Sequence, residues 1–264
     1  MTVVPGEALL LDCGNSRIKV ACLRANALVE QPMLPDPESA PAACCEALRG
    51  FASAGSVQRV LVSSVRSQAF TRALAACAAE CGLPDPEWAA TCTGATSLLS
   101  DYALGQLGVD RYLALLAARA RQRALPMVVV DCGTAVTLDR LEADGRHSGG
   151  VIAPGLAMML GALGRGTAAL PDIAMDGLHG DECGAASLGL PRDTARAIVV
   201  GTRTAFSGLI CAGVGRLDPE GRAEILFTGG DAEVAIGALG DNPRVSYVSS
   251  TLIFEGLLIW AGLA

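Results

Sequence analysis

Residues 9–20, with the sequence LLLDCGNSRIKV, decide the fold, because two apolar strands are joined there by a turn that carries Asp-Cys-Gly-Asn. A second stretch, residues 128–139, reads VVVDCGTAVTLD and repeats the order strand, Asp-Cys-Gly, small polar residue, strand. Two strands around a glycine-bearing turn are typical of a β-hairpin. The recurrence predicts two similar α/β halves, each of which opens with such a hairpin.

The segments between and after these hairpins predict helices that alternate with strands, which favours an α/β fold. Apolar and alanine-rich patterns predict helices at residues 42–54, 68–81, 110–124, 156–163, 194–216 and 252–260. Further strands are expected at residues 59–63 and 224–227, and the proline-rich residues 31–41 are expected to form a loop. We therefore place the halves at residues 1–115 and 116–264, with the last helix free to pack back on the first half.

The composition is that of a folded, acidic protein. Of its 264 residues, 51% are hydrophobic and 18% are charged, which excludes a disordered chain. The formal net charge is −7 and no basic block occurs, so binding to nucleic acid or anionic lipid is disfavoured. The ten cysteines form no CxxC pair and there are two histidines, which disfavours zinc binding. With no signal peptide and no long uninterrupted apolar run, we expect a cytoplasmic protein with reduced thiols and no membrane span.

The first hairpin loop carries groups that suit a nucleotide phosphate. Gly14 lets the backbone approach a ligand closely, and Asn15 and Ser16 supply short polar side chains. Successive backbone N–H groups in such a turn form an anion-binding nest. Asp12 would repel a phosphate, so we expect it to hold Mg²⁺ directly or through water. The alternative is an ordinary hairpin turn, which the presence of a second, equivalent loop makes the weaker interpretation.

The second hairpin loop and a third glycine-rich loop follow the same logic. Thr134 is a candidate donor to a phosphate, and Asp131 is a candidate cation ligand. Residues 228–231, Thr-Gly-Gly-Asp, lie between a predicted strand and a predicted helix, where paired glycines leave room for a base or ribose. Asp231 fits a helix N-cap equally well. Neither GxGxxG nor GxxxxGK[ST] occurs, which excludes Rossmann and Walker nucleotide sites.

The segment Leu-Gly-Val-Asp-Arg-Tyr, residues 107–112, opens a predicted helix. Asp110 in the first helical turn is favoured by the helix dipole, which is a sufficient structural reason for its presence. Its functional interpretation is a general base that accepts the proton of an attacking alcohol during phosphoryl transfer. Arg111 could bind an anionic substrate. Spacing alone favours the structural interpretation.

These motifs together resemble the type III pantothenate kinases, including the related Bvg accessory factor proteins. The resemblance covers nearly the whole chain and rests on residues 12–19 (DxGNTxxK), 107–111 (LGxDR), 131–139 (DxGTAxTxD), 149–155 (GGxIxPG), 167–171 (TAxLP) and 228–232 (TGGDA). Several motifs in the same order are specific, whereas any one alone is not. The resemblance implies an actin-like α/β fold of the acetate and sugar kinase/Hsp70/actin superfamily, with two RNase H-like halves flanking a nucleotide cleft.

The resemblance also implies ATP-dependent phosphorylation of pantothenate to 4'-phosphopantothenate, the first step of coenzyme A biosynthesis, by a homodimer. In this comparison Asp110 is the proton acceptor, Asp12 serves ATP and Mg²⁺, and Asp131 holds a monovalent cation, K⁺ or NH₄⁺, rather than Mg²⁺. The implied ATP-binding residues are Asp12, Cys13, Gly14, Asn15, Ser16, Arg17, Ile18, Lys19 and Thr134. The implied pantothenate-binding residues are Tyr102, Gly108, Val109, Asp110, Arg111 and Thr194.

Some positions depart from the family pattern. The spacing between Tyr102 and LGxDR is one residue short, and the usual proline between them is missing. Asp193 replaces the usual Asn before Thr194, and the Ser-Ser-Val-x-Pro stretch ends as Ser63-Ser64-Val65-Arg66-Ser67. Two alternatives stay open at this point: a non-catalytic regulatory accessory protein on the same fold, and an actin-like kinase for another small hydroxylated substrate.

Overall fold

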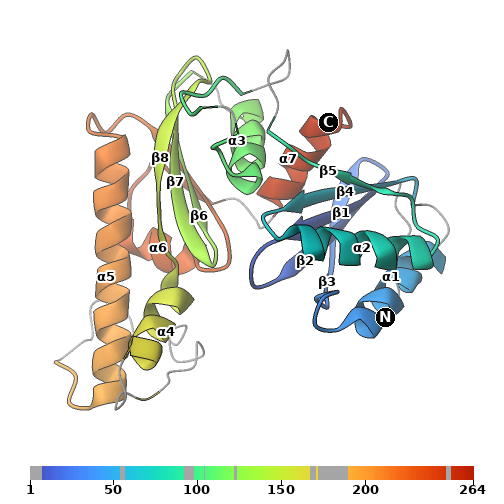
Figure 1. The fold of residues 1–264 in the computed structure, drawn as a ribbon. Helices are drawn as coiled ribbons and strands as arrows, with labels where there is room; N and C mark the ends of the chain where they lie inside the picture. The colour runs from blue at the N-terminus through green and yellow to red at the C-terminus, as the bar shows by residue number, and fades with distance from the viewer. Residues whose placement is uncertain are drawn as a thin grey trace. The chain divides into compact units, whose positions relative to one another are not determined.

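The computed structural model describes residues 8–53, 57–91, 98–103, 105–121, 124–166, 171, 190–247 and 251–264. The chain forms two compact units, Met1–Arg121 with Thr251–Ala264 and Gln122–Ser250 (Figure 1). The predicted halves were residues 1–115 and 116–264, with the last helix free to pack back on the first half. Helix α3 (Val109–Arg121) continues beyond residue 115 within the first unit, and the last helix, α7 (Leu252–Trp260), packs against α3 in that unit.

A five-stranded sheet in the order β3-β2-β1-β4-β5 forms the first unit. Strands β1, β2 and β3 form an antiparallel meander, and β4 and then β5 are added in parallel to β1. The strands are β1 Ala8–Cys13, β2 Ile18–Arg24, β3 Ala27–Leu34, β4 Arg59–Ser64 and β5 Pro86–Trp88. The other helices of this unit are α1 Pro41–Ser53 and α2 Gln68–Glu80.

The second unit repeats this topology in a sheet of order β10-β9-β6-β7-β8. Strands β6, β7 and β8 are antiparallel, and β9 and β10 are added in parallel to β6. The elements are β6 Met127–Cys132, β7 Ala135–Leu141, β8 His147–Pro154, β9 Glu224–Thr228, β10 Val245–Tyr247, α4 Leu156–Gly166, α5 Thr194–Leu217 and α6 Ala232–Leu239. This duplication confirms the prediction of two α/β halves that each open with a hairpin.

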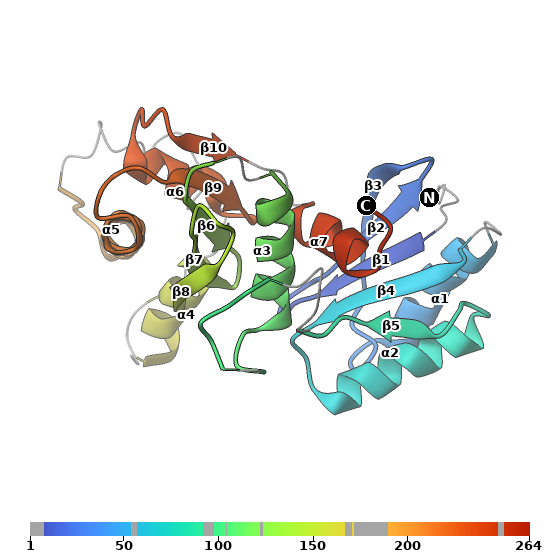
Figure 2. The ribbon, with the colours of Figure 1, turned by 90° about the horizontal axis from the view of Figure 1, so that it is seen from above.

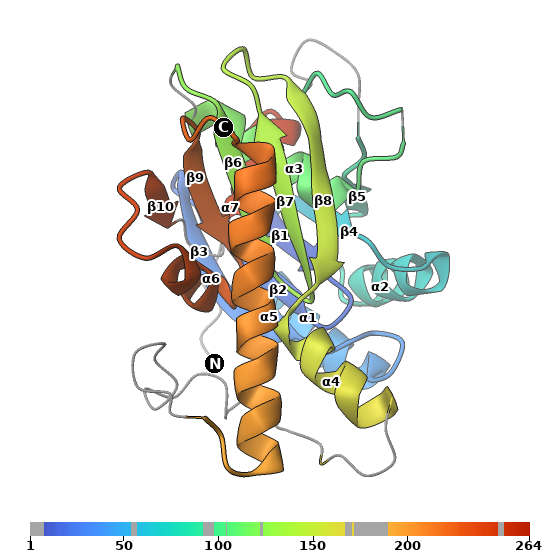
Figure 3. The same ribbon diagram turned by 90° about the vertical axis from the view of Figure 1, so that its left-hand side faces the viewer.

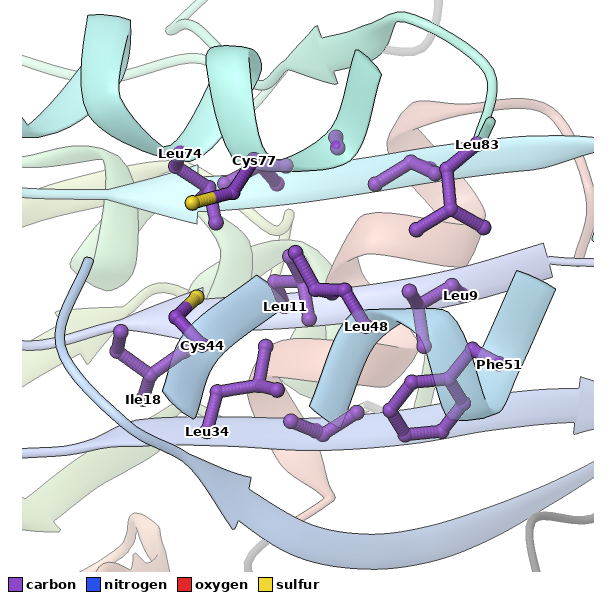
Figure 4. Close-up of a cluster of buried hydrophobic side chains, with 14 of the residues drawn as sticks. Leu9, Leu11, Ile18, Leu34, Cys44, Leu48, Phe51, Leu74, Cys77 and Leu83 are labelled. Carbon is purple, nitrogen blue, oxygen red and sulfur yellow. The ribbon is translucent and has the colours of Figure 1, made fainter. Parts of the chain in front are cut away.

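The core of the first unit lies between its sheet and the helices α1 and α2. Leu9 and Leu11 of β1 point toward these helices, and Leu48 and Phe51 of α1 meet them (Figure 4). Cys13 of β1 belongs to the same cluster of buried residues. The opposite face of the sheet is covered by α7, which packs on β1 and β4, and by α3, which packs on β4 (Figure 2). Because β1 is covered on both faces, all six of its residues are buried, which explains its continuous apolar sequence before the polar turn.

In the second unit α4, α5 and α6 cover one face of the sheet (Figure 3). Val128, Val130 and Cys132 of β6 meet Phe206 and Ile210 of α5 in this core. By length and hydropathy alone, the 24-residue helix α5 could cross a membrane. Core helices of globular proteins meet the same criteria, and Phe206, Ile210 and Val214 of α5 are buried in the core of this unit.

The prediction of a loop at residues 31–41 is wrong for residues 31–34, because β3 extends to Leu34. Pro32 has no N–H to donate, so its presence argues against a central strand, but edge strands and bulges tolerate proline. Strand β3 is the edge of the sheet, and its pairing with β2 shifts by one residue between Ile18 and Val20, opposite Pro32. The short strands β5 and β10 and the glycine-containing strand β8 were also not predicted.

Candidate active site

The first Asp-Cys-Gly loop is a tight connection between β1 and β2. The Gly14 N–H donates to the Arg17 carbonyl at 3.1 Å, and Asn15, Ser16 and Arg17 are exposed at the tip. Asp12 lies directly opposite Lys19 on antiparallel β2 and beside Ser63 on parallel β4. Residues paired in this way point to the same face of a sheet, so these three side chains share one face. The exposed loop and the Asp12 face therefore offer backbone donors, a carboxylate and an ammonium group to a ligand.

Two of the residues predicted to bind ATP, Cys13 and Ile18, direct their side chains into the core. Cys13 is 1% exposed and Ile18 is 3% exposed, and both belong to the cluster under α1 and α2. Burial, followed by the neighbouring Asp12 carboxylate, raises the pKa of the Cys13 thiol far above its ordinary value. The side chain of each is therefore a structural part of the hairpin, and only its backbone is available to a nucleotide.

Arg66, in the connection from β4 to α2, holds the first loop from outside. Its Nη1 donates to the Asn15 carbonyl at 3.3 Å and to the Gly14 carbonyl at 3.5 Å. Its Nη2 donates to the Asp36 carboxylate at 2.6 Å, and its guanidinium lies 4.5 Å from the centroid of the Phe70 ring. The Arg66 guanidinium is held by Asp36 and Phe70, and it in turn holds the backbone of the first loop through two carbonyl groups. The sequence showed Arg66 only as a departure from the family pattern.

Ser63 is a second residue that sequence reasoning did not assign to the site. It is 1% exposed, and its Oγ is the one fully buried side-chain nitrogen or oxygen atom in the described residues that lacks a hydrogen-bond partner. Leaving a buried polar group unsatisfied costs about 1–3 kcal/mol. Its position beside Asp12 depends on the pairing of two strands that are far apart in the sequence, so no local motif could reveal it.

The second Asp-Cys-Gly loop has the same surroundings in the second unit. Asp131 lies opposite Thr137 on antiparallel β7 and beside Thr228 on parallel β9. The Gly133 N–H donates to the Ala135 carbonyl at 3.1 Å, which closes a turn one residue shorter than the first. Asp131 thus has two threonines where Asp12 has a lysine and a serine. The neighbours of Asp131 therefore carry neutral hydroxyl groups, and neither of them carries an ammonium group.

Two glycines outside this loop hold its backbone in place. A Cβ at Gly155 would lie 2.2 Å from the Gly133 carbonyl oxygen, and the Gly155 N–H donates to the Thr134 carbonyl at 3.0 Å. Gly229 has a φ of +94°, and a Cβ there would lie 2.4 Å from the Cys132 carbonyl oxygen. The paired glycines Gly229 and Gly230 were expected to leave room for a base or ribose. At Gly229 the close neighbour is instead the backbone of the second loop.

Asp231 occupies the N-cap position of α6, which was one of its two predicted roles. Its side chain makes no capping hydrogen bond to the helix. Its backbone N–H instead donates to the Cys132 carbonyl at 3.1 Å. The segment after β9 is therefore tied to the second loop through the backbone of Asp231.

A third group of candidate residues surrounds the start of α3. The Asp110 Oδ1 accepts a hydrogen bond from the Arg111 N–H at 2.8 Å, and a Cβ at Gly108 would lie 2.7 Å from the same oxygen. Arg111 is 5% exposed, its Nη2 donates to the Tyr102 Oη at 3.2 Å, and its guanidinium lies 5.1 Å from the centroid of the Tyr102 ring. The altered spacing before LGxDR therefore still brings Tyr102 to Arg111. Val109 is the first residue of the helix and is partly buried.

Thr194 and Asp139 belong to the second unit. Thr194 is the first residue of α5, and Asp193 caps this helix by accepting from the Arg196 N–H at 2.8 Å. Asp for Asn at position 193 thus retains an N-capping side chain. Asp139, which sequence alone left ambiguous, is buried and lies 2.8 Å from Nε2 of the buried His147. This pair joins β7 to β8 within the sheet and away from the loop at Asp131.

The candidate residues are therefore divided between the two units. The first unit holds the Asp12 loop and the cluster of Tyr102, Asp110 and Arg111, and the second unit holds Asp131, Thr134 and Thr194. Within the described part of the chain, no three His, Cys, Asp or Glu side chains come together to form a metal site. A cation at Asp12 would thus need water or phosphate oxygens in addition to the Asp12 carboxylate, which is usual for Mg²⁺ bound with a nucleotide.

Comparison with known proteins identifies the family of this arrangement. A family model described as type III pantothenate kinase matches residues 8–216. The type III pantothenate kinase of Thiobacillus denitrificans is 35% identical over 263 residues, which cover 96% of this chain and 95% of the relative. That of Cellvibrio japonicus is 33% identical over 260 residues, with 97% of each chain covered.

Solved structures of lower identity support the fold alone. A Campylobacter jejuni protein described as a candidate Baf family transcriptional activator superposes with a TM-score of 0.56 and 19% identity, over 96% of this chain and 97% of that one. MreB5 of Spiroplasma citri bound to AMPPNP superposes with a TM-score of 0.50 and 13% identity, over 97% and 96%. The predicted actin-like α/β fold is thereby confirmed.

Proposed function

Because this chain belongs to the type III pantothenate kinase family, and therefore phosphorylates pantothenate with ATP in coenzyme A biosynthesis, we propose that Asp110 accepts the proton of the pantothenate hydroxyl. The observation that carries this assignment is the hydrogen bond from the Arg111 N–H to the Asp110 Oδ1. It holds the carboxylate in a fixed position at the first turn of α3. A base in a fixed position contributes roughly 10²–10⁴-fold to such a transfer.

The pantothenate site in this proposal consists of Tyr102, Gly108, Val109, Asp110 and Arg111, completed by Thr194. Arg111 supplies the positive charge for the pantothenate carboxylate, since a guanidinium binds a carboxylate through paired hydrogen bonds. The ring and hydroxyl of Tyr102 hold that guanidinium in one orientation. Thr194 belongs to the other unit, and its contribution rests on the family resemblance.

ATP binding in this proposal falls to residues 12–19 and to Thr134. The backbone N–H groups of the exposed residues Asn15, Ser16 and Arg17 suit phosphate oxygens, and Arg66 keeps this loop in place. Lys19 supplies a cation on the same face as Asp12. The Asp12 carboxylate and the unsatisfied Ser63 hydroxyl fit a hydrated Mg²⁺, which would neutralise the charge of the phosphates when bound.

We assign a monovalent cation, K⁺ or NH₄⁺, to Asp131. Its neighbours Thr137 and Thr228 add oxygen atoms without adding charge, which suits a singly charged ion better than a divalent one. The test is activity as a function of added KCl or NH₄Cl at constant ionic strength. We expect Asp131→Asn to lose the stimulation by the cation, and equal stimulation of wild type and variant would refute the assignment.

We also propose that the enzyme is a cytoplasmic homodimer in which α5 forms part of the interface. Small residues leave one side of this helix open, with Gly201, Ala205, Gly208 and Ala212 all exposed. Such residues allow another helix to approach closely. Gly208→Glu should shift the mass measured by light scattering toward the monomer, whereas Glu at the exposed Ala79 of α2 should not.

The central experiment measures ADP formation with each component omitted in turn. We expect turnover only when pantothenate, ATP, Mg²⁺ and K⁺ or NH₄⁺ are present together. Asp110→Asn should reduce kcat by about 10²–10⁴-fold and leave circular dichroism and thermal unfolding unchanged. The matched control is Asp85→Asn at an exposed position. Turnover of Asp110→Asn at the wild-type rate would refute the assignment of the base.

A further inference from the structure

The hydroxyl group of Ser63 has no hydrogen-bond partner among the described residues, so a bound ligand must supply one. In the described residues its Oγ is the only fully buried side-chain nitrogen or oxygen atom without a hydrogen-bond partner. An alanine would fill nearly the same volume without the cost of an unsatisfied hydroxyl, so the free protein gains nothing from the serine. A group kept at the expense of stability indicates a function in the bound state.

Strand pairing shows which ligand this hydroxyl can meet. Ser63 lies beside Asp12 across the parallel pair of β1 and β4, near the carboxyl ends of both strands. Val62, the preceding residue, points into the cluster under α1 and α2, so Ser63 points to the opposite face, which it shares with Asp12. Ligands of open α/β sheets bind outside the carboxyl ends of the strands.

The second sheet supplies an independent parallel to this arrangement. Thr228 lies beside Asp131 across the parallel pair of β6 and β9, and it is 3% exposed. Each Asp-Cys-Gly aspartate is therefore accompanied by a buried hydroxyl residue on the adjacent parallel strand. A hydroxyl at the same position in both sheets, at sites that we assign to different cations, points to a shared task at a cation.

We propose that Ser63 is a positioning residue for the divalent cation that accompanies the nucleotide, with its Oγ hydrogen-bonded to a water molecule of the hydrated cation held by Asp12. The proposal rests on the proposed role of Asp12 and deepens it. Mg²⁺ keeps several of its waters in proteins, so a site with one carboxylate needs further groups that orient those waters. Ser63 orients this water without touching either the cation or the phosphates.

The test compares wild type, Ser63→Ala and Ser64→Ala in binding and in stability. Mn²⁺ binding in the presence of ADP is followed by electron paramagnetic resonance, and the Mg²⁺ dependence of kcat is measured separately. Ser63→Ala should weaken Mn²⁺ binding by about 10–100-fold, as loss of an outer ligand partner does. Its melting temperature without ligand should equal that of wild type or exceed it by up to about 4 °C. Ser63→Thr, which copies the residue found at position 228, should restore binding.

Ser64→Ala is the matched control, because it is the same substitution one residue away on the other face of the strand. The Ser64 Oγ accepts from the Arg66 N–H at 3.2 Å, so this variant loses a protein hydrogen bond and should keep its Mn²⁺ affinity. Equal Mn²⁺ affinity in wild type and Ser63→Ala overturns the proposal, and so does a lower melting temperature of Ser63→Ala with unchanged binding. Failure of the proposed function is separate, since it is seen as absence of pantothenate-dependent ADP formation in wild type.

Discussion

The guanidinium of Arg111 contacts Tyr102 twice, because it lies over the face of the Tyr102 ring and also donates a hydrogen bond to the Tyr102 hydroxyl. The guanidinium lies 5.1 Å from the centroid of the ring, and its Nη2 donates to the Tyr102 Oη at 3.2 Å. Arg111 is almost fully buried, so few other orientations are open to it. The pair therefore fixes a positive charge one residue away from the proposed base, Asp110.

We expect Tyr102→Phe to raise KM for pantothenate by about 2–12-fold, because it removes one hydrogen bond from Arg111 and keeps the ring. Arg111→Lys should lower kcat/KM by about 10–100-fold, since lysine keeps the charge but not the planar pair of donors. Steady-state kinetics with pantothenate as the varied substrate measure both effects. KM for ATP serves as the internal control, and an equal rise in both KM values would contradict a specific role toward pantothenate.

Gly108→Ala should reduce kcat without loss of stability. The new Cβ would lie 2.7 Å from the Asp110 Oδ1, and the movable end of that side chain can give way more easily than backbone. A base displaced by about 1 Å can lose about 10²-fold in rate. The control is Gly237→Ala, where no heavy atom lies within 4 Å of the added Cβ. An unchanged kcat in Gly108→Ala would mean that the observed carboxylate position does not matter for the reaction.

The two hairpins could be predicted from sequence because their information is local. Buried strand, Asp-Cys-Gly turn and second strand follow one another within a dozen residues, and the structure has both. The edge strand β3 could not be predicted, since Pro32 is compatible with a strand only at an edge or bulge, and the sequence does not show which strand is the edge.

The residues that complete the Asp12 site were missed for a related reason. Ser63 belongs to the site only because its strand pairs with that of Asp12. Arg66 belongs to it only because its side chain donates to the Asn15 carbonyl. Both relations join segments that are separated by some fifty residues, so neither has a local pattern. In the comparison with the family, residues 63–67 stood out only as a departure from its pattern, with no role attached to Ser63 or Arg66.

Gly229→Ala should destabilise the second unit. The added Cβ would lie 2.4 Å from the Cys132 carbonyl oxygen, and a φ of +94° is itself unfavourable for alanine. Overpacking against backbone costs about 1–3 kcal/mol, and more where nothing can move. Thermal and urea unfolding should show the loss, together with weaker stimulation by K⁺ or NH₄⁺ because the second loop is displaced.

The neighbouring Gly230→Ala is the control for this effect. No heavy atom lies within 4 Å of a Cβ at Gly230, and its backbone is outside the left-handed region. Its free energy of unfolding should stay within about 0.5 kcal/mol of wild type. If both variants lose the same stability, the close approach of Gly229 to the second loop is not the cause.

The stability of the second unit should decline in acid because of Asp218. Burial pushes the pKa of this carboxyl upward, but the hydrogen bonds from Arg244 and from the N–H groups of Arg222 and Ala223 outweigh it, so the pKa lies below the ordinary value of 3.8. The Arg244 Nη1 donates to the Asp218 Oδ2 at 2.6 Å. A carboxyl with a lowered pKa in the folded state stabilises fully above the unfolded pKa, and this stabilisation is lost as pH falls through the folded value.

Asp218→Asn should therefore lower the free energy of unfolding at pH 7 by about 1.5–3 kcal/mol, the range for hydrogen bonds to a charged group. The difference from wild type should shrink below about pH 4, where wild type itself loses the charge. Urea unfolding between pH 3 and pH 7 measures both curves, and Asp241→Asn at an exposed position should follow wild type throughout. A constant gap between wild type and Asp218→Asn down to pH 3 would show that the ionised carboxylate does not provide this stability. The Asp218 side chain would then stabilise the end of α5 through packing and not through its charge.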